Sequence, residues 1–539
     1  MKNMKKLLLI CLLGLFATSV FGQVRNVTGV VTSGIDGSPV AEVQVRVKGS
    51  IEAVKSNAEG RYAIGVPETS SLILTFSHPD FDYEEIPLGG RSVLDVELSS
   101  SIRFNQYGLQ VNRNPLTAEE RDGVLVFESA DQDYKLWFDL RVQADGALFF
   151  GEVMNPIGRG VEMRRVRVAF KAELANNFEA EFDMDFADGL ADLKDAYLLY
   201  NATPRLDIKV GNFKERFSME QNTSSRWLTF MERPAALRTI APSRHLGVQF
   251  HYYRPYIVAV GGVHFQDVGD WEVIESRKDN YAAGHNEGYS LTGKLTFIPF
   301  YHDWNKGLHF GIAGSYRTPK THDRIDVVRF DSRSNVNINR KKYLDTDRIS
   351  NVDNYSFANF ELAGYYNNYK FAGEYIMANV NRYEQKIAGE KIGQLPSEKF
   401  NGFYLMAGTL LFGGEYVYNT YQAEFTQPRT GRSWGDIEFA VRYDFSDFNN
   451  PRDDGTFGVM GGSGEGLTLG ISYYAPKNVK LMMNYGYLNF DRYANQRGRL
   501  LVGNDANGQL TSNSFLVVDP TGKAGENFHW LAFRVQVAF

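Results

Sequence analysis

The last stretch of the chain alternates strictly between apolar and polar side chains. Five apolar residues share one face of residues 528–539: Leu531, Phe533, Val535, Val537 and Phe539. Arg534 and Gln536 lie on the other face. A repeat of two residues is the period of a β-strand, in which successive side chains point to opposite faces. This segment is therefore predicted to be a strand with one apolar and one polar face.

The same period recurs along the chain from residue 134 onward. It is clearest at residues 178–186, where Phe178, Phe182 and Phe186 share a face and acidic residues occupy the other. We predict strands at residues 134–150, 161–174, 178–187, 190–201, 206–215, 245–254, 256–266, 289–301, 307–319, 357–368, 369–382, 400–412, 436–447, 464–476, 478–491 and 528–539. Strands of soluble sheets also alternate between apolar and polar side chains. Here the pattern recurs over more than 400 residues without a convincing helical stretch. The prediction is an all-β fold, an antiparallel transmembrane β-barrel of about sixteen strands.

The connections between these strands differ in length in a regular way. Connections after even-numbered strands are mostly short, whereas long ones follow odd-numbered strands at 216–244, 267–288, 320–356 and 492–527. Outer-membrane barrels show this pattern because their periplasmic turns are short and their external loops are long. The connection 413–435 is long on the side of the short turns, and a hairpin within it would raise the strand count by two.

One long connection, 216–244, combines basic and large apolar side chains. It contains Arg226, Trp227, Phe230, Met231, Arg233, Arg238 and Arg244. Folding of the loop into the barrel would bury these apolar side chains and narrow the pore. A loop that caps the rim or packs in a subunit interface is the alternative.

The N-terminal part has a different pattern. Residues 1–22 combine lysines, an apolar run too short to span a bilayer comfortably and small residues at the end, which predicts a secretory signal peptide. Residues 24–100 contain short β-rich runs separated by turn clusters, which predicts a small β-sandwich. Residues 101–133 are polar and are predicted to connect this module to the barrel at 134–539.

Composition narrows the classes of function. Aromatic residues make up 14% of the chain, as expected for the aromatic belts of a barrel. The chain contains 51 Gly and only 17 Pro, as expected for tight turns between strands. A net charge of −6 predicts no nucleic-acid partner. Cys11, the only cysteine, lies in the signal segment, where a lipid-anchor site is the less favoured alternative. We find no metal-ligand spacing and no nucleophile or phosphate-loop motif, so no catalytic residue, metal or cofactor is predicted.

The segments 29–31 (GVV), 37–40 (GSPV), 45–49 (VRVKG), 57–62 (NAEGRY) and 66–67 (VP) occur in order within the N-terminal module. Together they resemble the carboxypeptidase-regulatory-like domain. The resemblance implies a transthyretin-like β-sandwich over residues 24–100, without peptidase activity. We expect this module to lie in the periplasm. Its role is left open between a spacer or folding aid and a docking module, and its partner is unknown.

Six segments at the start of the barrel also occur in order: 128–135 (ESADQDYK), 140–145 (LRVQAD), 163–167 (MRRVR), 193–197 (LKDAY), 210–214 (VGNFK) and 223–233 (TSSRWLTFMER). They resemble the phosphate-selective porin O and P family. This resemblance implies a homotrimeric porin, surrounded by outer-membrane lipid, in which arginines and lysines form a constriction for small anions such as phosphate.

The resemblance places the central arginines at Arg141, Arg164 and Arg165, puts Arg226 at a family lysine and Asp195 at a family acidic residue. Alternation along the strand makes Arg165 and Arg167 face the same way and turns Arg164 to the opposite face, from which it is expected to reach the lumen only near the strand end. Four acidic residues are expected to line the lumen beside the arginines: Glu179, Glu181, Asp183 and Asp185. These charges are either an anion-binding constriction or ordinary polar lining, since barrel interiors are polar in any case.

The function expected from these features is an outer-membrane porin for passive diffusion of small polar solutes, with anions such as phosphate as candidate solutes. One alternative is an uptake component of the TonB-dependent type that lacks its own plug. An outer-membrane barrel enzyme is the other, because residues from separate strands can meet at a rim without a local motif.

Overall fold

The computed structural model divides the chain into two compact units, Met1–Pro115 and Leu116–Phe539. It describes residues 24–67, 72–111, 116–121, 123–151, 157–189, 191–265, 267–268, 288–322, 325–333, 335–338, 342–452, 457–476, 478–491, 493–494, 500–519 and 525–539. The predicted signal peptide, residues 1–22, lies outside the described residues.

The first unit contains two small sheets that enclose one apolar core. One sheet has the order β4–β1–β7, from β1 (Val24–Ser33), β4 (Arg61–Pro67) and β7 (Val96–Leu98). The other has the order β3–β2–β5–β6, from β2 (Gln44–Val47), β3 (Ala53–Lys55), β5 (Ile73–His78) and β6 (Phe81–Pro87). Alternate residues of β4 are buried, and Tyr62 and Phe76, from different sheets, meet edge to face at 5.5 Å between ring centroids. The small β-rich module expected here is therefore present.

The stretch predicted to be a connector, residues 101–133, contains four short strands. These are β8 (Arg103–Phe104), β9 (Gln110–Val111), β10 (Leu116–Arg121) and β11 (Val124–Ser129). The last two form a hairpin, and β11 continues the hydrogen-bonded sheet of the barrel through the pair Val126 and Trp137. The second compact unit thus begins at Leu116 rather than at residue 134.

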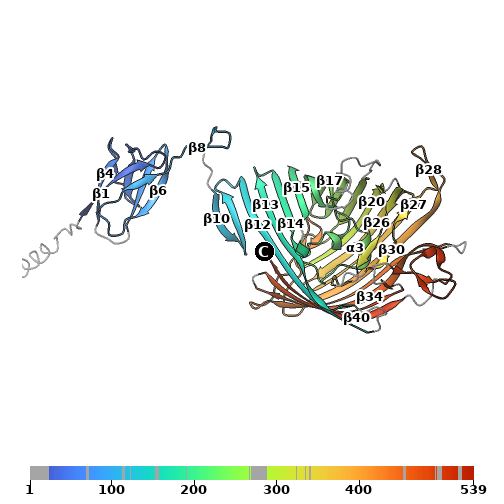
Figure 1. Ribbon diagram of the computed structural model, residues 1–539. Coiled ribbons are helices and arrows are strands. Elements are labelled where there is room, and N and C mark those ends of the chain that lie inside the picture. The colour runs from blue at the N-terminus through green and yellow to red at the C-terminus, as the bar shows by residue number, and fades with distance from the viewer. Residues whose placement is uncertain are drawn as a thin grey trace, which may run out of the picture. The chain divides into compact units, whose positions relative to one another are not determined.

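The second unit is an antiparallel barrel whose ring closes through pairing of β12 with β40 (Figure 1). Its sixteen strands are β12 (Tyr134–Phe150), β13 (Gly160–Leu174), β14 (Phe178–Asp185), β15 (Asp192–Thr203), β16 (Leu206–Lys214), β17 (Arg244–Arg254), β18 (Ile257–His264), β19 (Ser290–Phe297), β20 (Lys306–Arg317), β26 (Val352–Tyr366), β27 (Tyr369–Arg382), β30 (Leu395–Leu410), β33 (Asp436–Pro451), β34 (Phe457–Ala475), β35 (Val479–Phe490) and β40 (Glu526–Ala538). Each of the sixteen predicted strands overlaps one of them, and the predicted fold class is confirmed.

The alternation has the sense expected of a membrane barrel. On β40 the apolar Phe533 and Val535 are about half exposed, whereas Arg534 and Gln536 are almost fully buried. On β14, Phe178 and Phe182 are exposed while Asp183 and Asp185 are buried. Apolar side chains therefore face outward, where lipid solvates them, and polar side chains face the lumen.

The connection between β16 and β17 folds into the ring, as predicted for residues 216–244. It carries two short helices, α2 (Met219–Asn222) and α3 (Ala235–Ile240), and Figure 1 shows α3 inside the barrel. Residues of α3 pack in one core cluster with inward-facing residues of β27, β30 and β33. No helix among the described residues is long and apolar enough to cross a membrane.

The connection from β30 to β33 was long enough to hold a hairpin that would add two strands to the barrel. It contains a small hairpin of β31 (Tyr418–Asn419) and β32 (Glu424–Phe425), which pair only with each other and add no strand to the ring. The hairpin reaches β16 and β17 on the other side of the ring, where Tyr421 contacts His251 and Asp207. It therefore crosses the lumen from the end of the barrel that holds the short turns.

The remaining short elements lie in the other connections. They are η1 (Ala187–Gly189), β21 (Lys320–His322), β22 (Ile325–Val328), β23 (Asp331–Arg333), β24 (Lys342–Asp345), β25 (Ile349–Ser350), β28 (Gln385–Ile387), β29 (Glu390–Ile392), β36 (Tyr493–Ala494), β37 (Leu500–Leu501), β38 (Gly503–Asn504), β39 (Leu510–Thr511) and η2 (Ser514–Leu516).

Removal of residues 24–111 should leave the barrel able to fold, because the two units have separate apolar cores. The measurement is the heat-dependent mobility of the barrel on a detergent gel, with the full-length chain as the control. A truncated chain that never gains the mobility of the folded barrel would show that the module takes part in barrel assembly.

Candidate functional site

The loop between β16 and β17 enters the lumen and is held by buried charges on β13 and β40. Glu232 accepts from Arg164 at 2.6 Å and from Arg534 at 3.2 Å, and Arg238 lies 3.6 Å away. Burial alone would raise the pKa of Glu232, but the charges of Arg164, Arg238 and Arg165 lower it well below its usual range. A carboxylate surrounded in this way stays ionised, and the loop is fixed by charge-assisted hydrogen bonds.

The position of Arg164 corrects a prediction made from alternation. Gln143 pairs with Arg165 and the next residue, Ala144, pairs with Met163, so Arg164 is an extra residue in β13. Such a β-bulge breaks the period of two locally and turns the side chain. Arg164 therefore reaches Glu232 in the lumen instead of facing outward.

The other end of the loop is fixed by carboxylates of the barrel wall. Glu361 accepts from the backbone N–H of Met219 at 2.9 Å, and Glu374 accepts from that of Glu220 at 2.7 Å. These bonds satisfy donors at the start of α2, which have no partner within a helix of this length. The loop is thus attached to the wall at both of its ends.

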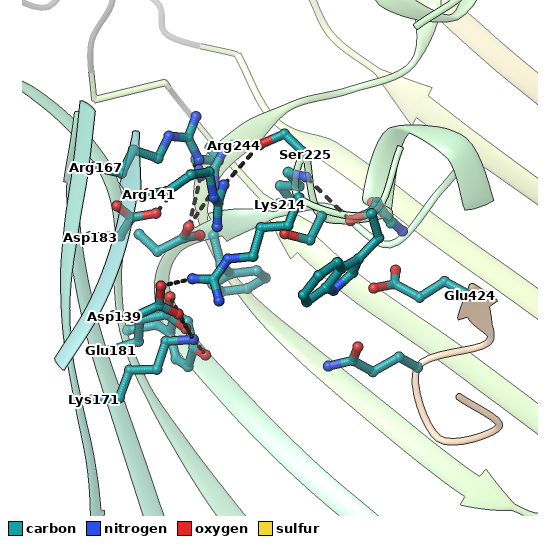
Figure 2. A pocket seen from close by; sticks show the side chains of 18 of the residues that line it. Asp139, Arg141, Arg167, Lys171, Glu181, Asp183, Lys214, Ser225, Arg244 and Glu424 are labelled. Carbon is teal, nitrogen blue, oxygen red and sulfur yellow. Dashed lines mark hydrogen bonds and ion pairs between the residues drawn. The ribbon is translucent and has the colours of Figure 1, made fainter. Parts of the chain in front are cut away.

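A cavity of about 280 Å³ lies between this loop, the β31–β32 hairpin and the wall formed by β12 to β17 (Figure 2). Among the described residues, eight basic side chains line it: Arg141, Arg167, Lys171, Lys209, Lys214, Arg216, Arg226 and Arg244. Five acidic side chains also line it: Asp139, Glu181, Asp183, Asp195 and Glu424. With every group ionised, eight positive and five negative charges leave a formal charge of +3.

The structure brings together only some of the residues predicted to form the constriction. Arg141, Arg167 and Arg226 line the cavity, whereas Arg164 and Arg165 do not. Arg164 is bound to Glu232, and Arg165 donates to the side-chain oxygen of Gln143 at 2.7 Å.

The predicted acidic residues divide in the same way. Glu181, Asp183 and Asp195 line the cavity, while Glu179 and Asp185 do not. Asp185 instead accepts from Arg167 at 2.9 Å. The expected row of acids beside the arginines is therefore split between the cavity and its surroundings.

Carboxylates neutralise several of the cavity cations. Arg226 pairs with Asp139, Arg244 binds Asp195 at 2.5 Å, and Lys171 lies 3.3 Å from Asp139. Burial lowers the pKa of the Arg226 guanidinium to about 10, so it remains charged at neutral pH. These pairs keep their side chains in place and contribute little net field.

Three cavity cations, Arg141, Lys209 and Lys214, have no carboxylate within 4.0 Å among the residues that the structure describes. Arg141 donates to the hydroxyl of Ser225 at 2.8 Å. The ammonium group of Lys209 lies over the ring of Tyr197, 3.9 Å from its centroid, and that of Lys214 donates to two backbone carbonyls. These are neutral partners, so the excess positive charge of the cavity resides on these three side chains.

The acids Glu181, Asp183 and Asp195 have oxygen atoms within 4.8 Å of one another, a spacing that could hold a metal ion. Each of them is already close to a basic group: Lys171 lies 3.6 Å from Glu181, Arg167 lies 3.6 Å from Asp183, and Arg244 binds Asp195. The charge of this cluster is thus compensated by the protein itself.

Sequence reasoning missed five of the cavity cations. Lys171 and Lys209 occupy lumen-facing positions of β13 and β16, so alternation alone could have found them. Lys214 and Arg244 lie at strand ends, and Arg216 lies in the loop beyond β16. Arg244 was among the basic residues of the connection expected to narrow the pore, but the local pattern did not assign any of the three to the constriction, because the folded loop brings them to the cavity.

The arrangement suits passage of small anions better than chemistry at a fixed group. The cavity offers several weak contacts to donors on different strands, and a bound anion can exchange one for another. The family model of phosphate-selective porin O and P matches residues 138–511. The chain belongs to the phosphate-selective porin O and P family. It is therefore an outer-membrane porin.

Two curated relatives resemble most of the chain. Porin O of Pseudomonas aeruginosa is 23% identical over 400 residues, which cover 70% of this chain and 88% of that protein. An uncharacterized protein of Caulobacter vibrioides is 26% identical over 371 residues, 68% of this chain and 70% of the relative. Among solved structures, the anion-selective porin from Comamonas acidovorans aligns with a TM-score of 0.43 at 11% identity, covering 75% of this chain and all of that one.

The substitution Glu232→Gln should loosen the loop that bounds the cavity of this porin. It leaves Arg164, Arg238 and Arg534 without their shared carboxylate, and breaking a buried ion pair costs roughly 3–5 kcal/mol. We expect a lower midpoint of denaturant unfolding in detergent and noisier single-channel current.

Glu173→Gln is the matched control, because Glu173 is half exposed and pairs only with Lys135 among the described residues. Its effect should stay within about 1 kcal/mol. Equal effects of the two substitutions would show that Glu232 does not hold the loop.

Proposed function

We propose that this porin passes small anions, phosphate among them, through the cavity between its two inward-folded segments. It does so as a homotrimer that catalyses no reaction, with the N-terminal unit in the periplasm. The observation that carries the proposal is the excess of three positive charges in the cavity, on side chains without a carboxylate partner. The family supports the same solute class and assembly.

The physical basis is replacement of hydration. A small anion that enters the cavity loses part of its water shell, and guanidinium and ammonium donors take its place. At an effective dielectric constant of about 20, one charge about 8 Å away stabilises the anion by about 2 kcal/mol. Contacts of this size concentrate anions in the passage and still let them leave.

The contents of the lumen support passive passage over the two alternatives. Among the described residues no histidine lines the cavity, so its Ser224 and Ser225 lack the imidazole base that most often activates a serine nucleophile. Two segments of the barrel's own chain occupy the lumen, where a transporter of the TonB-dependent type would hold its plug.

The sidedness of the connections supports a periplasmic location for the N-terminal unit. The chain enters β12 at the end of the barrel where the turn 367–368 and the other short turns lie. Short turns face the periplasm in bacterial barrels. The segment before β12 is therefore proposed to lie in the periplasm.

Replacement of Arg141 by alanine should make the pore less selective for anions. Arg141 contributes unpaired charge to the cavity, and its loss should lower the chloride-to-potassium permeability ratio by roughly threefold to tenfold at low salt. The measurement is the reversal potential of single channels in a planar bilayer under a salt gradient. Block of the chloride current by millimolar phosphate should weaken in parallel.

Arg165→Ala is the matched control, because Arg165 lies on the adjacent strand, is equally buried and does not line the cavity. It should change the reversal potential much less than Arg141→Ala. If the two substitutions act alike, or if neither changes selectivity or phosphate block, the cavity is not the site of anion selection.

A further inference from the structure

The loop between β16 and β17 contains a turn that the barrel wall holds in place. The backbone N–H of Trp227 donates to the carbonyl oxygen of Ser224 at 2.9 Å, which closes the four-residue turn 224–227. Four buried side chains of β12, β35 and β40 donate to this turn or to the residue after it: Arg141 to Ser225 Oγ at 2.8 Å, Gln143 to the Ser225 carbonyl at 3.1 Å, Gln536 to that of Arg226 at 3.2 Å and Lys480 to that of Leu228 at 2.8 Å. The turn is therefore fixed in position before any solute arrives.

Trp227 differs from the large apolar side chains that follow it in this segment. Leu228 and Phe230 are buried, and Phe230 joins the main apolar cluster. Trp227 is only partly buried, lines the cavity and belongs to none of the apolar clusters of the described residues. Contact between water and an apolar ring is unfavourable. A rigid indole that faces a cavity therefore favours a solute that covers it.

The other two aromatic side chains that line the cavity among the described residues are already covered. The ammonium group of Lys209 lies 3.9 Å from the ring centroid of Tyr197, and Phe213 is buried with its ring edge to face with Tyr197 at 6.3 Å. The guanidinium carbon of Arg226 lies 6.0 Å from the ring centroid of Trp227, at the outer limit of a cation–π contact. Trp227 is thus the ring that the cavity offers to a solute.

Unpaired positive charge is held by the same part of the loop. Arg141 donates to Ser225 within the turn, and Lys214 donates to the carbonyls of Gln221 and Asn222 just before it (Figure 2). An anionic group drawn to these cations brings whatever is attached to it toward Trp227. The cavity of about 280 Å³ is at the small end of the range for small-molecule pockets, which suits a solute with one ring.

We propose that Trp227 is a stacking platform and that the cavity takes small aromatic carboxylates, of which benzoate is the simplest. The carboxylate meets the unpaired cations while the ring stacks on the indole. The inference rests on the proposed passage of anions through this cavity. A well-oriented aromatic pair gains about twofold to tenfold in binding beyond the burial of its area.

The experiment compares block of single-channel chloride current by benzoate and by cyclohexanecarboxylate at neutral pH. Both are ionised and carry one carboxylate on a six-membered ring, but only benzoate has an aromatic face. The unmodified porin should bind benzoate about threefold to tenfold more tightly. In Trp227→Leu this preference should fall to about 1.5-fold or less, because leucine packs against both rings alike. Block by phosphate, which has no ring, should be the same in this variant as in the unmodified porin.

Two further variants are matched to this one. Trp227→Phe keeps an aromatic face and should retain a preference of about twofold or more. Trp137→Leu removes the indole of another partly buried tryptophan, which lies on β12 beside Lys135 and does not line the cavity. It should leave the preference for benzoate unchanged.

The outcomes separate this inference from the function on which it rests. Equal block by the two ring carboxylates in the unmodified porin overturns the role of Trp227 and leaves anion passage intact, and this test needs no variant to fold. A preference that survives in Trp227→Leu, or that is lost equally in Trp137→Leu, overturns it as well. If neither ring carboxylate nor phosphate blocks the current and the pore does not select anions, the proposed function fails together with the inference.

Discussion

Closure of the sheet through β12 and β40 is the constraint on which the rest of this structure depends. Arg141 to Phe150 pair residue by residue with Ala538 to His529, so neither strand has a free edge over that length. In lipid an unpaired backbone group costs several kcal/mol, and only a closed ring pairs them all. Once the ring is closed, every strand has one face toward lipid and one toward the lumen. Because the other face of each strand meets lipid, the charged side chains of these strands must face the lumen.

The enclosed charges explain why the lumen is built from ion pairs. A charge taken out of water is costly unless it is paired and hydrogen-bonded. Glu232 is the clearest case, since it joins the crossing loop to basic groups on β13 and β40. The same requirement accounts for the pairs of Asp139, Asp195 and their neighbours at the cavity wall. What remains after pairing is a small excess of positive charge among the side chains that line the cavity.

Both inward-folded segments bound the cavity. The loop with α2 and α3 enters from the end with long connections, and the β31–β32 hairpin enters from the end with short turns. Each crosses to the opposite side of the ring and contributes residues to the same cavity, such as Ser225 and Glu424. A passage bounded from both ends can be narrow without a narrow barrel. On the proposed function, a few side chains of these segments and of the facing wall, rather than the sixteen strands as a whole, set the solute preference.

The sequence by itself determined the strands, their number and the face of most side chains, because these depend on a local repeat of two residues. The inward orientation of Arg141, Arg167 and Asp183 follows directly from that repeat. It failed at Arg164, where a β-bulge adds one residue, and a bulge depends on the partner strand as much as on its own sequence. Only the tertiary structure decided which charges are paired, since Arg164 meets Glu232 and Arg244 meets Asp195 across many residues of chain. The net charge of the cavity is the number of basic side chains that line it minus the number of acidic ones. These side chains come together only once the ring has closed and both segments have folded into it.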